Sequence, residues 1–270
     1  MISRKEIIEK ELDLESQGIF DVHIDEPDLD LMIPVTEKFP YIKKGLLKIK
    51  NDLQKLFIVN PFIKHINKDV CKTKVIGREN LKGIKSCILT CNHVYMFDCL
   101  VATYAVRGHK IRITSAEFNN RSDKLGEYMR AGGLLPLSSN LRAMKNFNNA
   151  ISYYLKKNNY VMFYPEQAMW WMYEKPRPLK PGAFHYAVKE NVPIVPLFIT
   201  FEKNGTFDEE GIENKDFVIH ILKPIYLNKS LNDKENIRYM MNKNYNAWVN
   251  TYEGFYGKKM EYNHKQMKGN

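Results

Sequence analysis

Short apolar runs alternate with helix-like segments from about residue 73 to residue 201. Five apolar runs have the length and composition of strands: 87–91, 110–116, 134–138, 160–164 and 193–201. The segments between them repeat apolar residues at helical spacing, as at 97–106, 121–131, 141–157 and 182–190. This alternation predicts an α/β fold, a single domain whose mainly parallel sheet is joined by crossover helices. After residue 201 the pattern indicates an antiparallel addition at the sheet edge.

Helical patterns also flank this core. Ser3 and Glu6 have the spacing of a capping box and Gly18 is a typical stop, so we expect a short helix at about 4–17. Residues 40–57 have apolar residues at helical spacing with many lysines opposite. That pattern fits a helix lying on a membrane and a solvated helix face equally well.

A last helix is expected over roughly 233–250, before a basic, aromatic tail. We therefore divide the chain into three parts. These are an N-terminal helical and acidic extension (1–70), an α/β core (71–230) and a C-terminal helix with its tail (231–270).

Charge is unevenly distributed along the 270 residues. The net charge is +10, but residues 1–31 hold ten acidic against three basic residues, which is −7 and leaves +17 on the remainder. Such a basic body suits an anionic partner, such as nucleic acid, an anionic membrane surface or a phosphorylated substrate. The acidic segment is a candidate cover for part of this basic surface or a contact for another protein.

No targeting or membrane-spanning pattern is evident. The acidic N-terminal region lacks the apolar run of a secretory signal, and the best apolar stretch, 56–63, is short and broken by Asn60-Pro61. We expect a cytoplasmic protein without a transmembrane helix that meets membranes peripherally. The four cysteines fit reduced thiols better than disulfides.

Polar residues follow three of the predicted strands. Asn92-His93 follows 87–91, Ser138, Ser139 and Arg142 follow 134–138, and Pro165-Glu166 follows 160–164. Ligands of open parallel sheets bind at the carboxyl ends of the strands. The topology therefore directs these groups to one edge of the sheet.

His93 and Asp98 are five residues apart, which on a continuous helix separates their side chains by roughly 140°. With His93 in a turn and Asp98 in the first helical turn, the carboxylate can fold back onto the ring. Asp98 would then hold one ring nitrogen and leave the other as a base. On spacing alone, a turn histidine beside a helix-capping aspartate is the favoured interpretation.

The nearby cysteines offer two further interpretations. Cys87, Cys91, His93 and Cys99 resemble a zinc set, but no C-x-x-C pair is present, and we predict no metal. Cys91 is a conceivable nucleophile two residues before His93. A buried core thiol is the favoured interpretation.

Four ordered blocks in roughly 75–205 resemble the glycerolipid acyltransferases, the lysophosphatidic acid (1-acylglycerol-3-phosphate) acyltransferase family. His93 to Asp98 looks like its H-x4-D motif, "GGLLPLSSNLR" (132–142) its second block and "MFYPEQAMWW" (162–171) its third, F-P-E-G-[ST]-R. "VPIVPLFI" (192–199) is similar to the fourth. The resemblance implies a glycerol-3-phosphate acyltransferase-like fold and direct acyl transfer from acyl-carrier protein or acyl-coenzyme A, with no other cofactor.

In this interpretation His93 is the general base on an acceptor hydroxyl and Asp98 orients it. Glu166 would form hydrogen bonds near the glycerol. The arginine that the family's third block uses for the acceptor phosphate is replaced by Met169. We therefore assign the phosphate first to Arg142 and second to Arg177, with Lys175 and Lys180 as further candidates. A solvated basic loop at 175–180 is the alternative.

Trp170, Trp171 and Tyr173 precede that basic loop and fit either a membrane–water interface or packing onto the core. The expected partners are a lysophospholipid acceptor, the acyl donor and an anionic membrane surface, in phospholipid biosynthesis. A different lysolipid or alcohol acceptor is the alternative. A non-catalytic membrane-binding or nucleic-acid-binding protein is the alternative from another class. Since no nucleic-acid-binding motif is evident, we expect no nucleic-acid partner.

Overall fold

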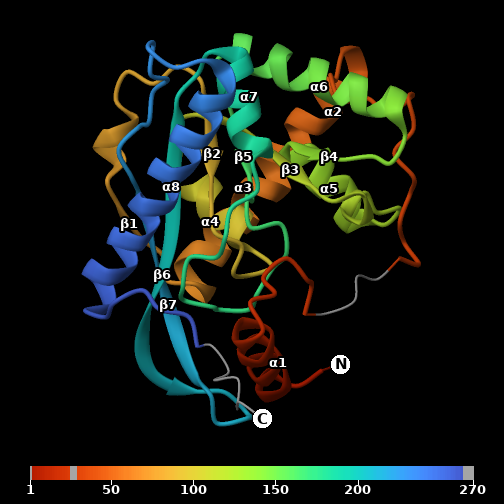
Figure 1. Ribbon diagram of the computed structural model, residues 1–270. Helices are drawn as coiled ribbons and strands as arrows, with labels where there is room; N and C mark the ends of the chain where they lie inside the picture. The colour runs from red at the N-terminus through yellow and green to blue at the C-terminus, as the bar shows by residue number, and fades with distance from the viewer. Residues whose placement is uncertain (1, 25–28, 264–270) are drawn as a thin grey trace.

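A seven-stranded sheet forms the centre of the computed structural model, which describes residues 2–24 and 29–263 (Figure 1). The strands are β1 (Lys74–Ile76), β2 (Cys87–Thr90), β3 (Lys110–Ser115), β4 (Leu134–Pro136), β5 (Asn159–Phe163), β6 (Ile194–Phe207) and β7 (Glu213–Ile221). Their spatial order is β1-β7-β6-β2-β5-β3-β4, and all neighbouring pairs are parallel except the antiparallel pair β6–β7. The predicted α/β class and mainly parallel sheet are confirmed.

Helices cover both faces of this sheet. They are α1 (Arg4–Ser16), α2 (Gly45–Gln54), α3 (Asn60–His65), α4 (Asp98–Ala105), α5 (Lys124–Gly132), α6 (Leu141–Lys156), α7 (Gly182–Glu190) and α8 (Asp233–Tyr256). Alternate residues of the central strands point to opposite faces, as the pleat requires. Leu89 and Met162 pack with α4 on one face, whereas Ile88 and Val161 pack with α6 and α7 on the other. The core is therefore a three-layer α/β/α arrangement.

The antiparallel strand after residue 201 is present, but it does not form the edge. The short strand β1, which the apolar pattern did not predict, pairs in parallel with β7 and lies outside it. Three residues are too few to show a strand pattern. The two edge strands of the sheet are β1 and β4.

The helix expected at 40–57 begins at Gly45 and continues much further. Two π-helical segments, Lys55–Val59 and Ile66–Val70, join α2 to α3 and extend the helical run to residue 70. Pro61 lacks a backbone N–H, so the preceding turn cannot keep a regular α-helical hydrogen-bond ladder. We call residues 45–70 the long N-terminal helix.

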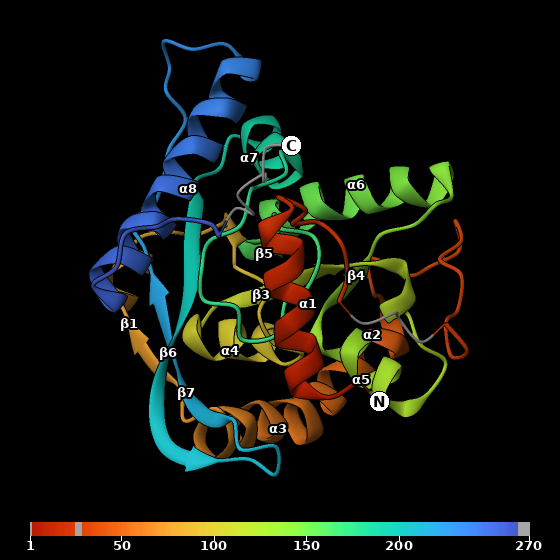
Figure 2. The same cartoon turned by 60° about the horizontal axis from the view of Figure 1, so that its bottom comes forward.

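The expected helix at 4–17 is present as α1, with the predicted capping box between Ser3 and Glu6. Residues 21–24 and 29–34, on either side of residues 25–28, which lie outside the described residues, are irregular. In Figure 2, α1 lies in front of the loop that follows β5. Within the described residues, no helix is both long enough and apolar enough to cross a membrane.

Candidate active site

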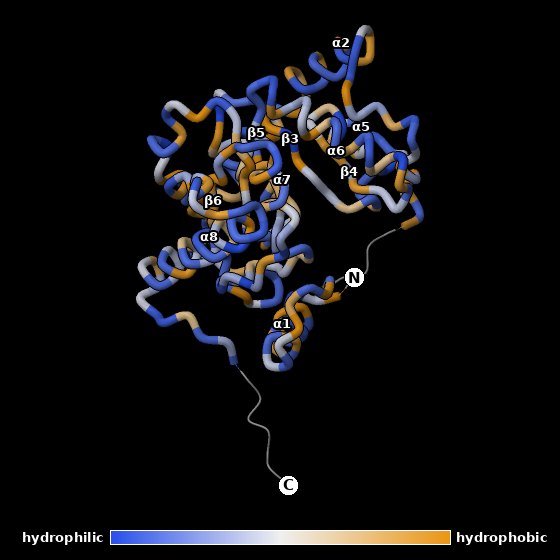
Figure 3. The backbone as a smooth tube through the Cα atoms, turned by 45° about the horizontal axis from the view of Figure 1, so that its top comes forward, coloured by the Kyte–Doolittle hydropathy of each residue, from blue (hydrophilic) through white to orange (hydrophobic). Residues whose placement is uncertain are grey.

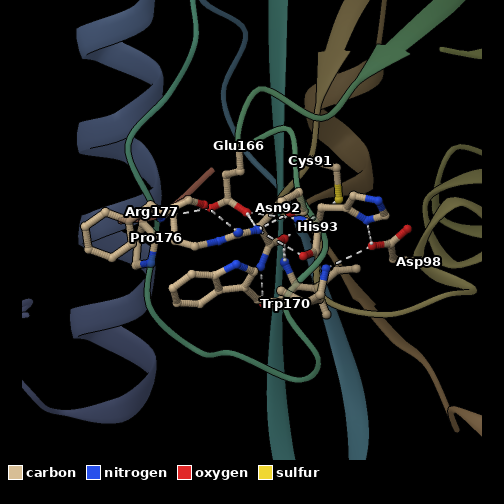
Figure 4. A network of polar contacts seen from close by, with 12 residues as sticks. Cys91, Asn92, His93, Asp98, Glu166, Trp170, Pro176 and Arg177 are labelled. Atoms are coloured by element: carbon tan, nitrogen blue, oxygen red, sulfur yellow. Dashed lines mark hydrogen bonds and ion pairs between the residues drawn. The ribbon is translucent and has the colours of Figure 1, made fainter. Parts of the chain in front are cut away.

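His93 and Asp98 form a hydrogen-bonded pair where the chain leaves β2 (Figure 4). His93 Nδ1 lies 2.7 Å from Asp98 Oδ2. Asp98 is the first residue of α4, and its Oδ2 also accepts from the backbone N–H groups of Val94 and Tyr95, at 3.0 and 3.2 Å. A buried carboxylate at a helix N-terminus is stabilised by such donors and by the helix dipole. The sequence expectation that the turn folds Asp98 back onto the ring is therefore met.

The two side chains differ in their access to solvent. The Asp98 side chain is 1% exposed, whereas that of His93 is 22% exposed. Since Asp98 occupies Nδ1, Nε2 is the ring nitrogen left for a substrate group. The geometry fits a general base whose ring is oriented by Asp98 through Nδ1 and whose Nε2 can be reached by a substrate.

The backbone of His93 is held from three directions. Asn92 exchanges two hydrogen bonds with the backbone of Ile199 on β6, at 2.8 and 2.9 Å. Glu166 Oε2 accepts from the N–H of His93 at 3.0 Å, and the carbonyl of His93 accepts from the N–H of Trp170 at 3.0 Å. Hydrogen bonds thus hold the turn after β2 to β6 and to the loop after β5. They fix the backbone position from which the His93 side chain extends.

Tyr164 is a neighbour of this pair that the sequence analysis missed. Its ring stacks on that of His93 with centroids 4.0 Å apart, and its hydroxyl donates to Asp98 Oδ1 at 2.5 Å. The signal available in the sequence was its position directly after β5, one residue before Pro165, within the third block. Because β5 is hydrogen-bonded to β2, that position faces His93.

Glu166, expected to contact the acceptor, has both carboxylate oxygens occupied by the protein. Oε1 accepts from the backbone N–H of Arg177 at 2.8 Å, and Oε2 accepts from Arg177 Nη2 at 2.8 Å as well as from His93. The glutamate is 1% exposed. In this arrangement Glu166 organises the protein around His93 and does not present an oxygen to a glycerol.

Arg177 was expected either in a phosphate site or in a solvated loop, and the structure places it in neither. Its side chain is 0% exposed. Its guanidinium donates to Glu166 and to the carbonyls of His93, Ala168 and Phe20, at 2.6–3.1 Å. It also lies over the ring of Trp170, 4.9 Å from the centroid. Its donors are turned inward, as Figure 4 shows.

The N-terminal segment pairs with the two lysines of the same loop. Lys175 Nζ lies 2.6 Å from Glu15, a fully buried carboxylate, and Lys180 Nζ lies 2.7 Å from Asp21. The acidic segment therefore covers part of the basic surface, one of the two roles left open from the sequence. Both lysines are therefore already paired with a protein carboxylate, and a ligand would have to compete with that carboxylate.

Arg142 is not brought to His93. It lies at the start of α6, after the edge strand β4, and β5 and β3 stand between β4 and β2. At about 4.8 Å between neighbouring strands, that order separates the two strand ends by roughly 14 Å. The Arg142 side chain is 83% exposed and its partner is Glu37, at 3.4 Å.

The aromatic residues of the third block pack onto the protein. Trp170 is 0% exposed and donates from Nε1 to the carbonyl of Val22, and Tyr173 is 8% exposed. Trp171 is partly exposed, with the guanidinium of Arg4 4.9 Å from its ring centroid. For Trp170 and Tyr173, core packing is therefore the correct interpretation.

The cysteine thiols are kept neutral by their surroundings. Cys91 is 0% exposed, and burial raises its pKa well above the usual range, with the charges of Asp98 and Glu166 adding to the effect. Burial also raises the pKa of Cys99 to about 12. A neutral, inaccessible thiol is a poor nucleophile, so Cys91 is a core residue. In residues 2–24 and 29–263, no cluster of three or more His, Cys, Asp or Glu side chains is suited to a metal.

Comparison with known proteins agrees with the geometry. Residues 72–200 match the model of the Acyltransferase family. The chain is 27% identical over 165 residues to 1-acyl-sn-glycerol-3-phosphate acyltransferase of Saccharomyces cerevisiae. The matched residues make up 60% of this chain and 54% of the yeast protein. The chain thus spans about half the length of this curated relative.

The fold has a counterpart among solved structures. The crystal structure of the 1-acyl-sn-glycerophosphate acyltransferase PlsC from Thermotoga maritima superposes with a TM-score of 0.51 at 16% identity, covering 79% of this chain and 98% of that one. At this identity the likeness concerns the fold. The family match identifies residues 72–200, within the α/β core, as an Acyltransferase domain.

Proposed function

We propose that this protein transfers a fatty acyl group from a thioester to the free hydroxyl of lysophosphatidic acid, giving phosphatidic acid. The donor would be acyl-carrier protein or acyl-coenzyme A. The observation that carries the proposal is the His93–Asp98 pair, with its 2.7 Å hydrogen bond and its accessible ring. The similarity to the yeast lysophosphatidic acid acyltransferase supports this acceptor.

In the proposed reaction, Nε2 of His93 removes the proton from the acceptor hydroxyl as its oxygen attacks the thioester carbonyl carbon. The new C–O bond forms, the C–S bond breaks, and the departing thiolate takes the proton from the imidazolium. Asp98 stabilises the positive ring between these two proton transfers. No covalent acyl-enzyme is needed, which agrees with the burial of Cys91.

A second candidate keeps this chemistry and changes the acceptor to a lysolipid or alcohol without a phosphomonoester. Met169 stands where the family has arginine, and the guanidinium of Arg177 is enclosed by protein acceptors. Lys175 and Lys180 are paired with Glu15 and Asp21. A phosphate at this loop would have to displace these carboxylates, whereas an uncharged headgroup would not.

The long N-terminal helix supports a peripheral membrane role. It exposes a stripe of large apolar side chains, namely Leu46 (84%), Ile49 (56%), Leu53 (52%), Leu56 (56%) and Phe57 (69%). Lys44, directly before this helix, and lysines 48, 50, 64 and 68 along it are exposed. Apolar side chains flanked by cations fit an anionic lipid surface. In Figure 3, α2 lies at the margin of the fold, with apolar and polar residues alternating along it.

This apolar stripe continues toward the site. The ring of Phe62 on α3 lies 5.7 Å from that of Phe97, next to Asp98, and Met96 in the same turn is 63% exposed. A lipid surface that met the stripe would therefore be close to the turn that carries His93.

The deciding experiment measures thioester consumption by the purified protein, wild type beside His93→Ala. Each donor is offered with lysophosphatidic acid, with a neutral monoacylglycerol and with a lysolipid carrying a phosphodiester headgroup. Formation of phosphatidic acid by the wild type alone supports the first candidate. Turnover confined to the other acceptors supports the second. Equal turnover by His93→Ala would contradict both.

A further inference from the structure

Tyr164 contacts both members of the His93–Asp98 pair. Its ring lies almost parallel to the imidazole, with 19° between the planes, and its hydroxyl reaches Asp98 Oδ1. The third block of the family, F-P-E-G-[ST]-R, has phenylalanine before the proline, whereas this chain has Tyr164 before Pro165. A phenylalanine offers the ring without the hydroxyl, so the motif residue could not make the hydrogen bond that Tyr164 gives to Asp98.

The hydroxyl completes the environment of the buried carboxylate. Oδ2 accepts from His93 and from the N–H groups of Val94 and Tyr95, and Oδ1 accepts from Tyr164. Burial and the negative charge of Asp98 raise the pKa of Tyr164 well above its usual range, so its hydroxyl stays protonated and donates. With both oxygens held, the carboxyl plane cannot rotate away from the ring.

Two consequences for His93 follow. Stacking at 4.0 Å restricts the tilt of the imidazole and thereby the direction in which Nε2 points. The Tyr164 hydrogen bond withdraws negative charge from Asp98, which reduces how strongly the carboxylate stabilises the protonated ring. A base must be unprotonated to accept a proton, so this reduction extends its working range to lower pH.

We propose that Tyr164 is a positioning residue for acyl transfer, whose ring orients His93 and whose hydroxyl sets the pH range in which His93 acts as a base. The proposal rests on the proposed function for its kinetic consequence. Its effect on the ring of His93 exists whether or not the substrate is known.

The test compares Tyr164→Phe with Tyr160→Phe. Tyr160 lies on β5, the strand that Tyr164 directly follows, and is buried, but its hydroxyl donates to the carbonyl of Ile84 at 2.7 Å, away from the pair. Tyr160→Phe therefore removes a tyrosine hydroxyl whose contacts are the Ile84 carbonyl and His109 Nε2, at 3.4 Å, and leaves the His93–Asp98 pair untouched. A structural effect on the strand would appear in both, whereas the proposed effect belongs to Tyr164 alone.

The primary measurement is the NMR titration of the His93 ring, assigned by the signal that disappears in His93→Ala. In Tyr164→Phe, Asp98 keeps more of its charge, the protonated ring is favoured, and the titration midpoint is expected to move up by about half a pH unit to one unit. In Tyr160→Phe it should match the wild type. This measurement needs no turnover, so an error in the proposed acceptor leaves it intact.

The kinetic measurement is the pH profile of kcat/KM on whichever acceptor the wild type uses. The acidic limb in Tyr164→Phe should move to higher pH by the same amount as the NMR midpoint. Tyr164→Leu, which also removes the stacked ring, should lower kcat by about 10–100-fold with circular dichroism unchanged. Superimposable titrations of Tyr164→Phe and wild type would overturn the proposal, as would equal shifts in Tyr164→Phe and Tyr160→Phe.

Discussion

The turn after β2 and the loop after β5 meet at the carboxyl edge of the sheet and use their polar side chains in opposite ways. In the turn, Asp98 is buried and satisfied while the ring of His93 keeps one nitrogen toward solvent. In the loop, Glu166 and Arg177 are both buried and neutralise each other. The sequence indicated a catalytic role for the first pair and contact with the acceptor for the second. The difference lies in whether one member remains accessible.

This contrast separates two kinds of loss on mutation. A group that meets the substrate can be removed with little effect on folding, because its outer side already contacts water. A group whose partners are all inside the protein leaves those partners unsatisfied when it is removed. Activity and stability should therefore respond separately to changes in the two regions.

The largest expected effect is that of His93→Ala on activity. Loss of a general base lowers kcat by about 10²–10⁴-fold. The melting temperature should change little, because the buried Asp98 carboxylate keeps its hydrogen bonds from Val94, Tyr95 and Tyr164. Initial rates of thioester consumption and differential scanning calorimetry measure the two quantities. A large fall in melting temperature would remove the distinction drawn between the turn and the loop.

Arg177→Ala should have the reverse signature. It leaves the buried Glu166 carboxylate without its cation, and breaking a buried pair in this way costs about 3–5 kcal/mol of unfolding free energy. Urea denaturation measures this loss, with the exposed Arg142→Ala as the matched control, expected to be near neutral. If Arg177→Ala keeps its stability and instead raises the KM for a phosphorylated acceptor, Arg177 is a phosphate ligand after all.

A double replacement of Leu56 and Phe57 by serine should weaken binding to anionic vesicles. Burial of a large apolar side chain contributes about 1.5–3 kcal/mol, so at least a tenfold weaker partition is expected. Co-sedimentation with phosphatidylglycerol vesicles measures this. Leu141→Ser on α6, where the leucine is 87% exposed, serves as the control. Equal losses of vesicle binding in the double variant and in Leu141→Ser would contradict a special role for the long N-terminal helix.

The smallest effects concern the lysines beneath the N-terminal segment. The Lys180–Asp21 pair is about half exposed, so Lys180→Ala should cost less than about 1 kcal/mol. Lys175→Ala strands the buried carboxylate of Glu15 and should cost about 1–3 kcal/mol. Thermal unfolding of the two variants measures the difference. Equal changes would show that burial of Glu15 does not decide the strength of this contact.

The sequence by itself determined the class of fold, the helices between the strands and the His93–Asp98 pair. These are properties of short stretches, because hydrophobic periodicity is local and five residues suffice to bring Asp98 onto the ring of His93. The ordered blocks added the family. Strand ends such as those of β2 and β5 were also correctly directed to one edge, since all strands of a parallel sheet point the same way.

Only the tertiary structure decided which of these ends are neighbours and which charges are already paired. Arg142 follows a strand end on the correct edge, but β4 lies at the margin of the sheet, three strands from β2. Tyr164 gains its role because β5 is the neighbour of β2. Lys175 and Arg177 are paired with Glu15 and Glu166, which lie 160 and 11 residues away along the chain. Strand order and long-range ion pairs depend on contacts between distant residues, and no local pattern encodes them.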